Sequence, residues 1–241
     1  LQAENLTVYY QTLHGDAQAL EDATFAVADG EIMGLAGESG CGKSTLANCL
    51  IILKPPMKLV AGRVLLDGDE LPIADMERMN SFRFDCLSII PQYAMNAMNP
   101  TLKIGKMTSD LLRTRQVDYQ SMLPELHRRL DLVNLPHDVL NMYPIELSGG
   151  MKQRMVMVLS TLLNPSLLLA DEITSALDVS SQRAVAEMLA GFRDWELVKS
   201  IIVITHDISI LYQIADSILV MYAGQLVEKA STTTIIRSPR H

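Results

Sequence analysis

Cysteine is scarce in this chain, and it has no long apolar run and no block of positive charge. The three cysteines, Cys41, Cys49 and Cys86, lack the spacing of metal ligands, and a small odd number is typical of a reducing compartment. The most apolar stretch, residues 155–170, is interrupted by polar residues and a proline, so it does not read as a membrane span. These absences argue against a disulfide framework, a cysteine metal site and a transmembrane segment.

The charge balance is acidic, with a formal net charge of −8 at pH 7. A nucleic-acid-binding surface usually needs clustered lysine and arginine, so we expect no nucleic-acid partner. Hydrophobic residues make up 49% of the 241 residues and charged residues 20%, which is ordinary for an α/β protein with a substantial core.

Residues 37–45 read Gly-Glu-Ser-Gly-Cys-Gly-Lys-Ser-Thr and match the phosphate-loop pattern G-x-x-x-x-G-K-[ST]. An apolar strand is expected at 31–36 and a helix at 44–52, which is the strand–loop–helix context that the pattern requires. In such a loop the backbone N–H groups face phosphate oxygens, a lysine reaches the β- and γ-phosphates, and a serine hydroxyl ligates Mg²⁺. We therefore expect a nucleoside triphosphate to bind at Gly37, Ser39, Gly40, Cys41, Gly42, Lys43, Ser44 and Thr45.

The rest of the chain predicts an α/β fold in three parts. Alternating residues near the N-terminus predict antiparallel strands, including one at 23–27 and one at 63–66. Residues 104–163 have apolar residues at helical spacing, whereas 87–90, 167–170 and 201–204 read as buried strands of a mainly parallel central sheet. Residues 217–222 and 225–229 read as a hairpin around Ala223-Gly224.

This organisation corresponds to a P-loop NTPase core with an N-terminal antiparallel β subdomain and an inserted α-helical subdomain. We expect a single domain over residues 1–241. Residues 1–92 and 164–241 would form the nucleotide-binding core, and 93–163 the helical subdomain.

Two carboxylates, Asp171 and Glu172, directly follow the expected strand at 167–170. The carboxyl ends of strands in α/β sheets hold ligands, and phosphoryl transfer to water needs an acid that organises Mg²⁺ and a group that orients the water. Asp171 suits the first role and Glu172 the second. A solvated loop after a strand is the alternative, and the phosphate loop favours the functional interpretation.

Leu147-Ser-Gly-Gly-Met151 lies at the start of an expected helix. Ser148 can cap this helix, and the N–H groups around Gly149 and Gly150 would form a second anion site. By itself the pattern favours an ordinary capped helix start.

Together these motifs resemble the nucleotide-binding subunit of ATP-binding cassette (ABC) transporters. Residues 37–45 resemble the Walker A loop, 147–151 the signature motif and 167–172 the Walker B strand. Residues 175–178 resemble the D-loop, and His206 and Gln92 the switch histidine and the Q-loop glutamine.

The resemblance implies roles that the residues alone do not give. Two cassettes would pack head to tail, so that Ser148, Gly149 and Gly150 act on ATP held by the partner's Walker A loop. His206 would help Glu172 and Lys43 in catalysis, Gln92 would join Ser44 and Asp171 at Mg²⁺, and Asp178 would contact the opposite subunit. Tyr10 would stack on adenine, with Tyr9 as the fallback.

Within the family, Met151 and the surrounding residues resemble the branch of oligopeptide, dipeptide and nickel importers, whereas Ile173 departs from the usual proline. The implied function is an ATP-hydrolysing subunit of an importer for peptides or a related small solute, on the cytoplasmic face of the cell membrane. Implied partners are a second ABC ATPase subunit (identical or not), two integral membrane permease subunits docked through residues 93–106 and, indirectly, an extracytoplasmic substrate-binding protein. The alternatives are a non-transport ABC-type ATPase and a regulatory cassette that binds ATP without turnover.

Overall fold

A computed structural model describes residues 1–92, 98–174 and 177–240. The chain divides into two compact units, one formed by residues 1–91 and 164–241 and the other by residues 92–163. Within the described residues, no helix combines the length and the apolar character needed to cross a membrane.

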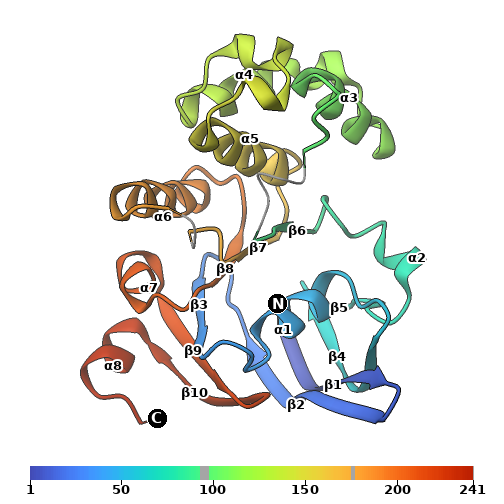
Figure 1. The fold of residues 1–241 in the computed structure, drawn as a ribbon, viewed down its shortest axis with the longest axis vertical. Coiled ribbons are helices and arrows are strands. Elements are labelled where there is room, and N and C mark those ends of the chain that lie inside the picture. Colours follow the sequence, from blue (N-terminus) through green and yellow to red (C-terminus); the bar gives the residue numbers. More distant parts are fainter. Residues whose placement is uncertain (93–97, 175–176, 241) are drawn as a thin grey trace. The chain divides into compact units, whose positions relative to one another are not determined.

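The larger unit contains the mainly parallel sheet that the sequence predicts. Its strand order is β10-β9-β3-β8-β7-β6, and neighbouring strands are parallel except for the β9–β10 hairpin (Figure 1). The strands are β3 (Ile32–Gly37), β6 (Leu87–Ile90), β7 (Leu167–Asp171), β8 (Ser200–Ile204), β9 (Ser217–Tyr222) and β10 (Gln225–Ser231). Every residue of β7 and β8 is buried, which explains their continuous apolar sequences.

The antiparallel sheet of the same unit has the order β2-β1-β4-β5. Its strands are β1 (Gln2–Thr12), β2 (Gly15–Ala26), β4 (Met57–Leu66) and β5 (Asp69–Glu70). Strands β2 and β4 begin well before the expected 23–27 and 63–66, and their first halves are largely exposed. Pairing with β1, not side-chain pattern, extends both strands.

Helices cover the core sheet on both faces. Helix α1 (Lys43–Ile51) contacts strands of both sheets, whereas α6 (Val179–Asp194) contacts β8 and α7 (Ile208–Ile214) contacts β3. The main apolar core forms where α1 packs between the two sheets, and it includes Leu6, Leu46 and Leu169. The short helices α2 (Met76–Met79) and α8 (Thr232–Arg237) complete the unit.

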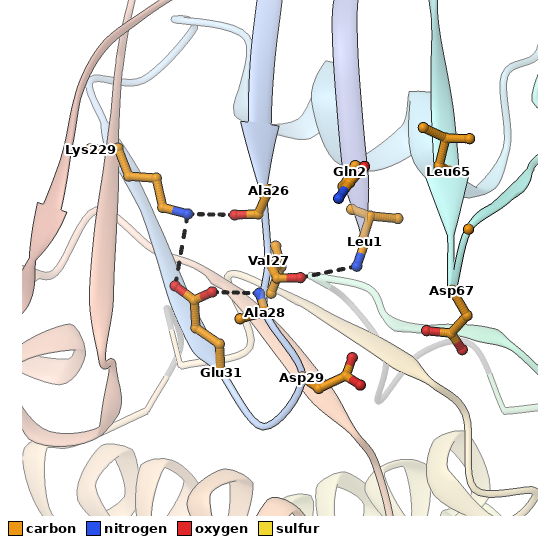
Figure 2. Close-up of a pocket in the computed structure, with 11 residues that line it drawn as sticks. Leu1, Gln2, Ala26, Val27, Ala28, Asp29, Glu31, Leu65, Asp67 and Lys229 are labelled. Carbon is orange, nitrogen blue, oxygen red and sulfur yellow. Dashed lines mark hydrogen bonds and ion pairs between the residues drawn. The ribbon is translucent and has the colours of Figure 1, made fainter.

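Hydrogen bonds and ion pairs around Glu31 join the two sheets (Figure 2). One carboxylate oxygen accepts a hydrogen bond from the Ala28 N–H at 2.7 Å, and the other accepts one from the Ser217 hydroxyl and lies 3.9 Å from Lys229 Nζ. Lys229 Nζ also donates to the Ala26 carbonyl. These contacts therefore link β10 to the end of β2 and to the residue that precedes β3.

The smaller unit is helical. It comprises α3 (Ile104–Thr114), α4 (Tyr119–Leu132), the 3-10 turns η2 (His137–Asn141) and η3 (Pro144–Glu146), and α5 (Gly149–Thr161). The α/β fold class predicted from the sequence is confirmed.

Candidate nucleotide site

The strand order gathers three motifs at one edge of the core sheet. Strands β3, β8 and β7 are neighbours, and all three are parallel. The phosphate loop follows β3, Asp171 ends β7, and His206 follows β8. Because parallel strands end at the same edge, residues separated by more than 160 positions face one site.

The phosphate loop depends on glycine at both of its fixed glycine positions, Gly37 and Gly42. Gly37 has φ 155°, and a Cβ there would lie 2.2 Å from the Met221 carbonyl oxygen. Gly42 has φ 109°, and its Cβ would lie 2.8 Å from the Ala19 carbonyl oxygen. At both positions left-handed backbone and close backbone neighbours exclude larger residues.

Gly42 is also the N-cap of α1. The first N–H groups of a helix have no partner within the helix, so those of Lys43, Ser44 and Thr45 are available at this end. Unpaired N–H groups and the helix dipole together make such an end an anion site.

Lys43 lies across the loop, with only 5% of its surface exposed. Its Nζ donates hydrogen bonds to the carbonyl oxygens of Gly37 at 2.8 Å and Glu38 at 2.7 Å. The sulfur of Cys41 lies 3.8 Å from the same nitrogen. The loop thus holds one buried ammonium group against its own carbonyl oxygens.

Asp171 is 9% exposed, and its Oδ1 is buried without a hydrogen-bond partner. Burial and the neighbouring Glu172 raise the pKa of this carboxyl group, while Lys43 and a hydrogen bond from Ser44 act to lower the pKa. A buried carboxylate oxygen beside a serine hydroxyl is an oxygen donor set of the kind Mg²⁺ prefers. The residues present therefore fit this ion.

Glu172 follows Asp171 with a left-handed backbone of φ 47°, and its N–H donates to the Ile204 carbonyl at 2.9 Å. Its Oε1 lies 3.8 Å from His206 Nδ1, an ion-pair distance that is too long for a hydrogen bond. The Glu172 side chain is 21% exposed and that of His206 is 63% exposed. Both side chains are therefore accessible at the edge of the sheet.

Tyr10, on β1, reaches the same region. Its hydroxyl forms a hydrogen bond of 3.0 Å with the Thr45 hydroxyl in the first turn of α1. The predicted aromatic residue is thus connected directly to the helix that follows the phosphate loop.

The remaining predicted residues belong to other elements of the chain. Ser148 caps α5 by accepting a hydrogen bond from the Met151 N–H at 3.2 Å, and a Cβ on Gly150 would meet nothing within 4 Å. Gln92 is exposed and belongs to the same smaller unit as Ser148 and Gly149.

Asp178 caps α6, and hydrogen bonds from Ser180 and Ser181 hold its pKa well below the ordinary value. Two predicted segments fall partly outside the described residues. These are the first part of the D-loop, 175–176, and the first part of the permease-docking stretch 93–106, residues 93–97.

Sequence reasoning missed the backbone groups that support the phosphate loop. The Met221 and Ala19 carbonyls contact its glycines, and the Gly224 N–H donates to the Cys41 carbonyl at 2.9 Å. The sequence signals only a hairpin turn at Ala223-Gly224. Its position beside the loop depends on the pairing of β9 with β3.

A glycine-rich loop between a buried parallel strand and a helix, with a buried aspartate on a nearby strand, defines the class of P-loop NTPases. Comparison with known proteins then gives the family. The chain belongs to the ABC transporter family, whose model matches residues 20–175, as an ATP-binding and ATP-hydrolysing subunit.

Curated relatives match over the whole chain. The "Oligopeptide transport ATP-binding protein OppD" of Bacillus subtilis (strain 168) is 34% identical over 246 residues, which cover 100% of this chain and 68% of the relative. The "Dipeptide transport ATP-binding protein DppD" of the same organism is 36% identical over 246 residues, covering 100% of this chain and 73% of the relative. The relationship predicted from the motifs is confirmed.

A solved structure shares the fold. The "Dimeric Structure of MJ0796, a Bacterial ABC Transporter Cassette" has a TM-score of 0.79 and 23% sequence identity, covering 96% of this chain and 98% of that one.

Proposed function

We propose that this cassette powers the import of peptides, or of a related small solute, by hydrolysing ATP on the cytoplasmic face of a membrane. The names of its oligopeptide and dipeptide transport relatives support the cargo class. The observation that carries the proposal for ATP is the site itself, where Lys43, the start of α1 and the unpartnered Asp171 Oδ1 lie at one sheet edge.

We assign phosphate binding to the loop residues 37–45 and adenine stacking to Tyr10. Ser44, Asp171 and Gln92 would hold Mg²⁺, which when bound neutralises phosphate charge. Lys43 would supply a positive charge to the β- and γ-phosphates. Its buried ammonium group lies beside the carbonyl oxygens of Gly37 and Glu38, within the loop that we assign to phosphate binding.

We assign the orientation of the attacking water to Glu172, assisted by His206. The 3.8 Å between their side chains allows a hydrogen bond to form by a small movement, as catalytic contacts often tighten when substrate binds. Ile173 in place of the usual proline leaves both residues at the site.

We further propose that the site is completed by a second ABC subunit. Ser148, Gly149 and Gly150 form an exposed helix N-terminus in the smaller unit, which suits an anion held by another molecule. Asp178 would contact that partner. The assembly would include two membrane permeases and receive cargo from an extracytoplasmic binding protein.

Uptake of a labelled oligopeptide into proteoliposomes that contain the complete transporter tests this function. We expect uptake that requires MgATP and is abolished by Lys43→Ala. Loss of charged hydrogen bonds should weaken MgATP binding about 10- to 100-fold.

Lys54→Ala is the matched control, because Lys54 is exposed and follows α1. It should change neither binding nor uptake. Suppose that ATP hydrolysis depends on Lys43 but is never stimulated by peptide-loaded binding protein. This result would support the assignment of ATPase activity and overturn the assignment of peptides as cargo.

A further inference from the structure

The turn between β9 and β10 packs directly on the phosphate loop. Ala223 and Gly224 form a two-residue hairpin turn, with φ of 46° and 81°. Two consecutive left-handed residues match the twist of a tight hairpin. The turn is far from residues 37–45 in sequence, but β9 is paired in parallel with β3, the strand that leads into the loop.

Both peptide groups of Gly224 form hydrogen bonds beside the loop. Its N–H donates to the Cys41 carbonyl at 2.9 Å, and its own carbonyl accepts a hydrogen bond from the Glu21 N–H at 2.9 Å. Gly224 therefore links the phosphate loop to β2 of the antiparallel sheet.

The backbones of the phosphate loop, the β9–β10 turn and β2 lie close together. A Cβ on Gly224 would lie 3.0 Å from the Ala19 carbonyl oxygen and 3.3 Å from its carbon. A Cβ on Gly42 would lie 2.8 Å from the same oxygen and 3.7 Å from the Gly224 Cα. A side chain at position 224 would therefore press on the Ala19 carbonyl of β2, so the turn or β2 would have to shift by a few tenths of an ångström, which would disturb the Gly224 N–H that holds Cys41.

This contact fixes a peptide plane inside the phosphate loop. In a planar trans peptide the C=O and the next N–H point in opposite directions. Because the Cys41 carbonyl is held toward Gly224, the Gly42 N–H is directed away from the turn. Phosphate loops bind anions through N–H groups oriented in this way.

We propose that Gly224 is a positioning residue for phosphate binding: its N–H holds the Cys41 carbonyl and thereby orients the loop N–H groups before ATP arrives. This inference concerns a residue outside the sequence motifs, and it rests on ATP binding at residues 37–45.

The test is Gly224→Ala, with Gly68→Ala as the matched control. Gly68 has φ 94° in the Asp67-Gly68 turn, and a Cβ there would meet nothing within 4 Å. Both substitutions place a side chain on left-handed backbone, but only the Cβ of Gly224→Ala meets a close backbone neighbour, the Ala19 carbonyl. Equilibrium binding of MgATP and of adenosine is measured on the full chain, together with KM and kcat for the assembled transporter.

We expect Gly224→Ala to weaken MgATP binding about tenfold, as for loss of one oriented hydrogen bond, and to raise KM with little change in kcat. Adenosine affinity should stay unchanged, because adenosine has no phosphate. Gly68→Ala should leave all four quantities unchanged.

Gly224→Asn provides a second variant if the alanine variant does not fold, since asparagine tolerates the left-handed backbone but carries the same Cβ. Unchanged MgATP affinity in the folded variant, or an equal loss for MgATP and adenosine, would overturn the inference. If Lys43→Ala still lowers the affinity for MgATP, such a result contradicts only the role of Gly224, and the assignment of the nucleotide site is unaffected.

Discussion

The left-handed backbone of Glu172 accompanies the position of its carboxylate beside His206. Its φ of 47° is uncommon for a residue with a side chain and costs about 1–2 kcal/mol. The hydrogen bond from its N–H to the Ile204 carbonyl on the neighbouring strand holds it there. The conformation leaves the carboxylate 3.8 Å from the His206 imidazole.

At this scale we predict that Glu172→Gln lowers ATP turnover by about 100-fold or more, because a glutamine amide cannot accept a proton from water. MgATP affinity should be retained, since the phosphate loop is untouched. Steady-state hydrolysis and equilibrium nucleotide binding measure the two effects.

Glu187→Gln is the control, because Glu187 pairs with Arg183 on the exposed side of α6. It should hydrolyse ATP at the unmodified rate. If Glu172→Gln also hydrolyses ATP at the unmodified rate, the role assigned to Glu172 is wrong.

Among the elements, α4 depends on a buried cation. Arg129 is 1% exposed; its Nε donates to Glu125 Oε1 at 2.8 Å, and its Nη1 donates to the Thr161 carbonyl at the end of α5. Hydrogen bonds from Arg128 and Arg129 lower the pKa of Glu125 from 4.5 to about 2. Arg129 therefore joins α4 to α5, and Glu125 on the same helix holds its guanidinium group.

We predict that Glu125→Gln lowers the free energy of unfolding by about 1.5–3 kcal/mol at pH 7, the usual contribution of hydrogen bonds to a charged group. Urea unfolding followed by circular dichroism measures the change. Glu187→Gln, which breaks an exposed pair, should cost less than about 1 kcal/mol.

The same variant has a pH signature. Because the folded pKa of Glu125 lies below the unfolded value, its stabilisation is complete above about pH 4.5 and is lost as pH falls toward about 2. The difference between unmodified protein and Glu125→Gln should shrink over that range. A difference independent of pH would show that the carboxylate charge is not the cause.

At the scale of the whole molecule, the two proposed anion sites belong to different compact units. The phosphate loop lies in the unit of residues 1–91 and 164–241, and Ser148 lies in that of residues 92–163. Under the proposed assembly, Ser148 of one subunit serves the ATP of the other.

We predict that Ser148→Arg leaves MgATP affinity of the isolated chain unchanged but abolishes turnover in the assembled transporter, because the arginine would block the second subunit's nucleotide. In a dimer of this chain, pairing a Ser148→Arg subunit with a Lys43→Ala subunit should restore hydrolysis, since one composite site stays intact.

Ser121→Arg on α4 is the control, because Ser121 is exposed in the same unit and should leave turnover unchanged. Full turnover by Ser148→Arg, or no recovery in the mixed dimer, would contradict action in trans.

Local patterns predicted much of the fold. Strands β3, β6, β7 and β8 and helix α1 lie within one or two residues of the expected positions, because buried strands are apolar on both faces and the glycine pattern fixes where the helix starts. The exposed halves of β2 and β4 were missed, because only pairing with β1 defines them.

The sequence by itself determined the chemistry available: a loop that binds phosphate, an acidic pair after a strand and a second helix N-terminus after Ser148. These are short-range features, set by residues a few positions apart. Only the tertiary structure decided that β8 lies between β3 and β7, bringing His206 to Glu172, and that Gly224 supports Cys41. Strand order and backbone packing arise from contacts between distant segments, and no local pattern encodes them.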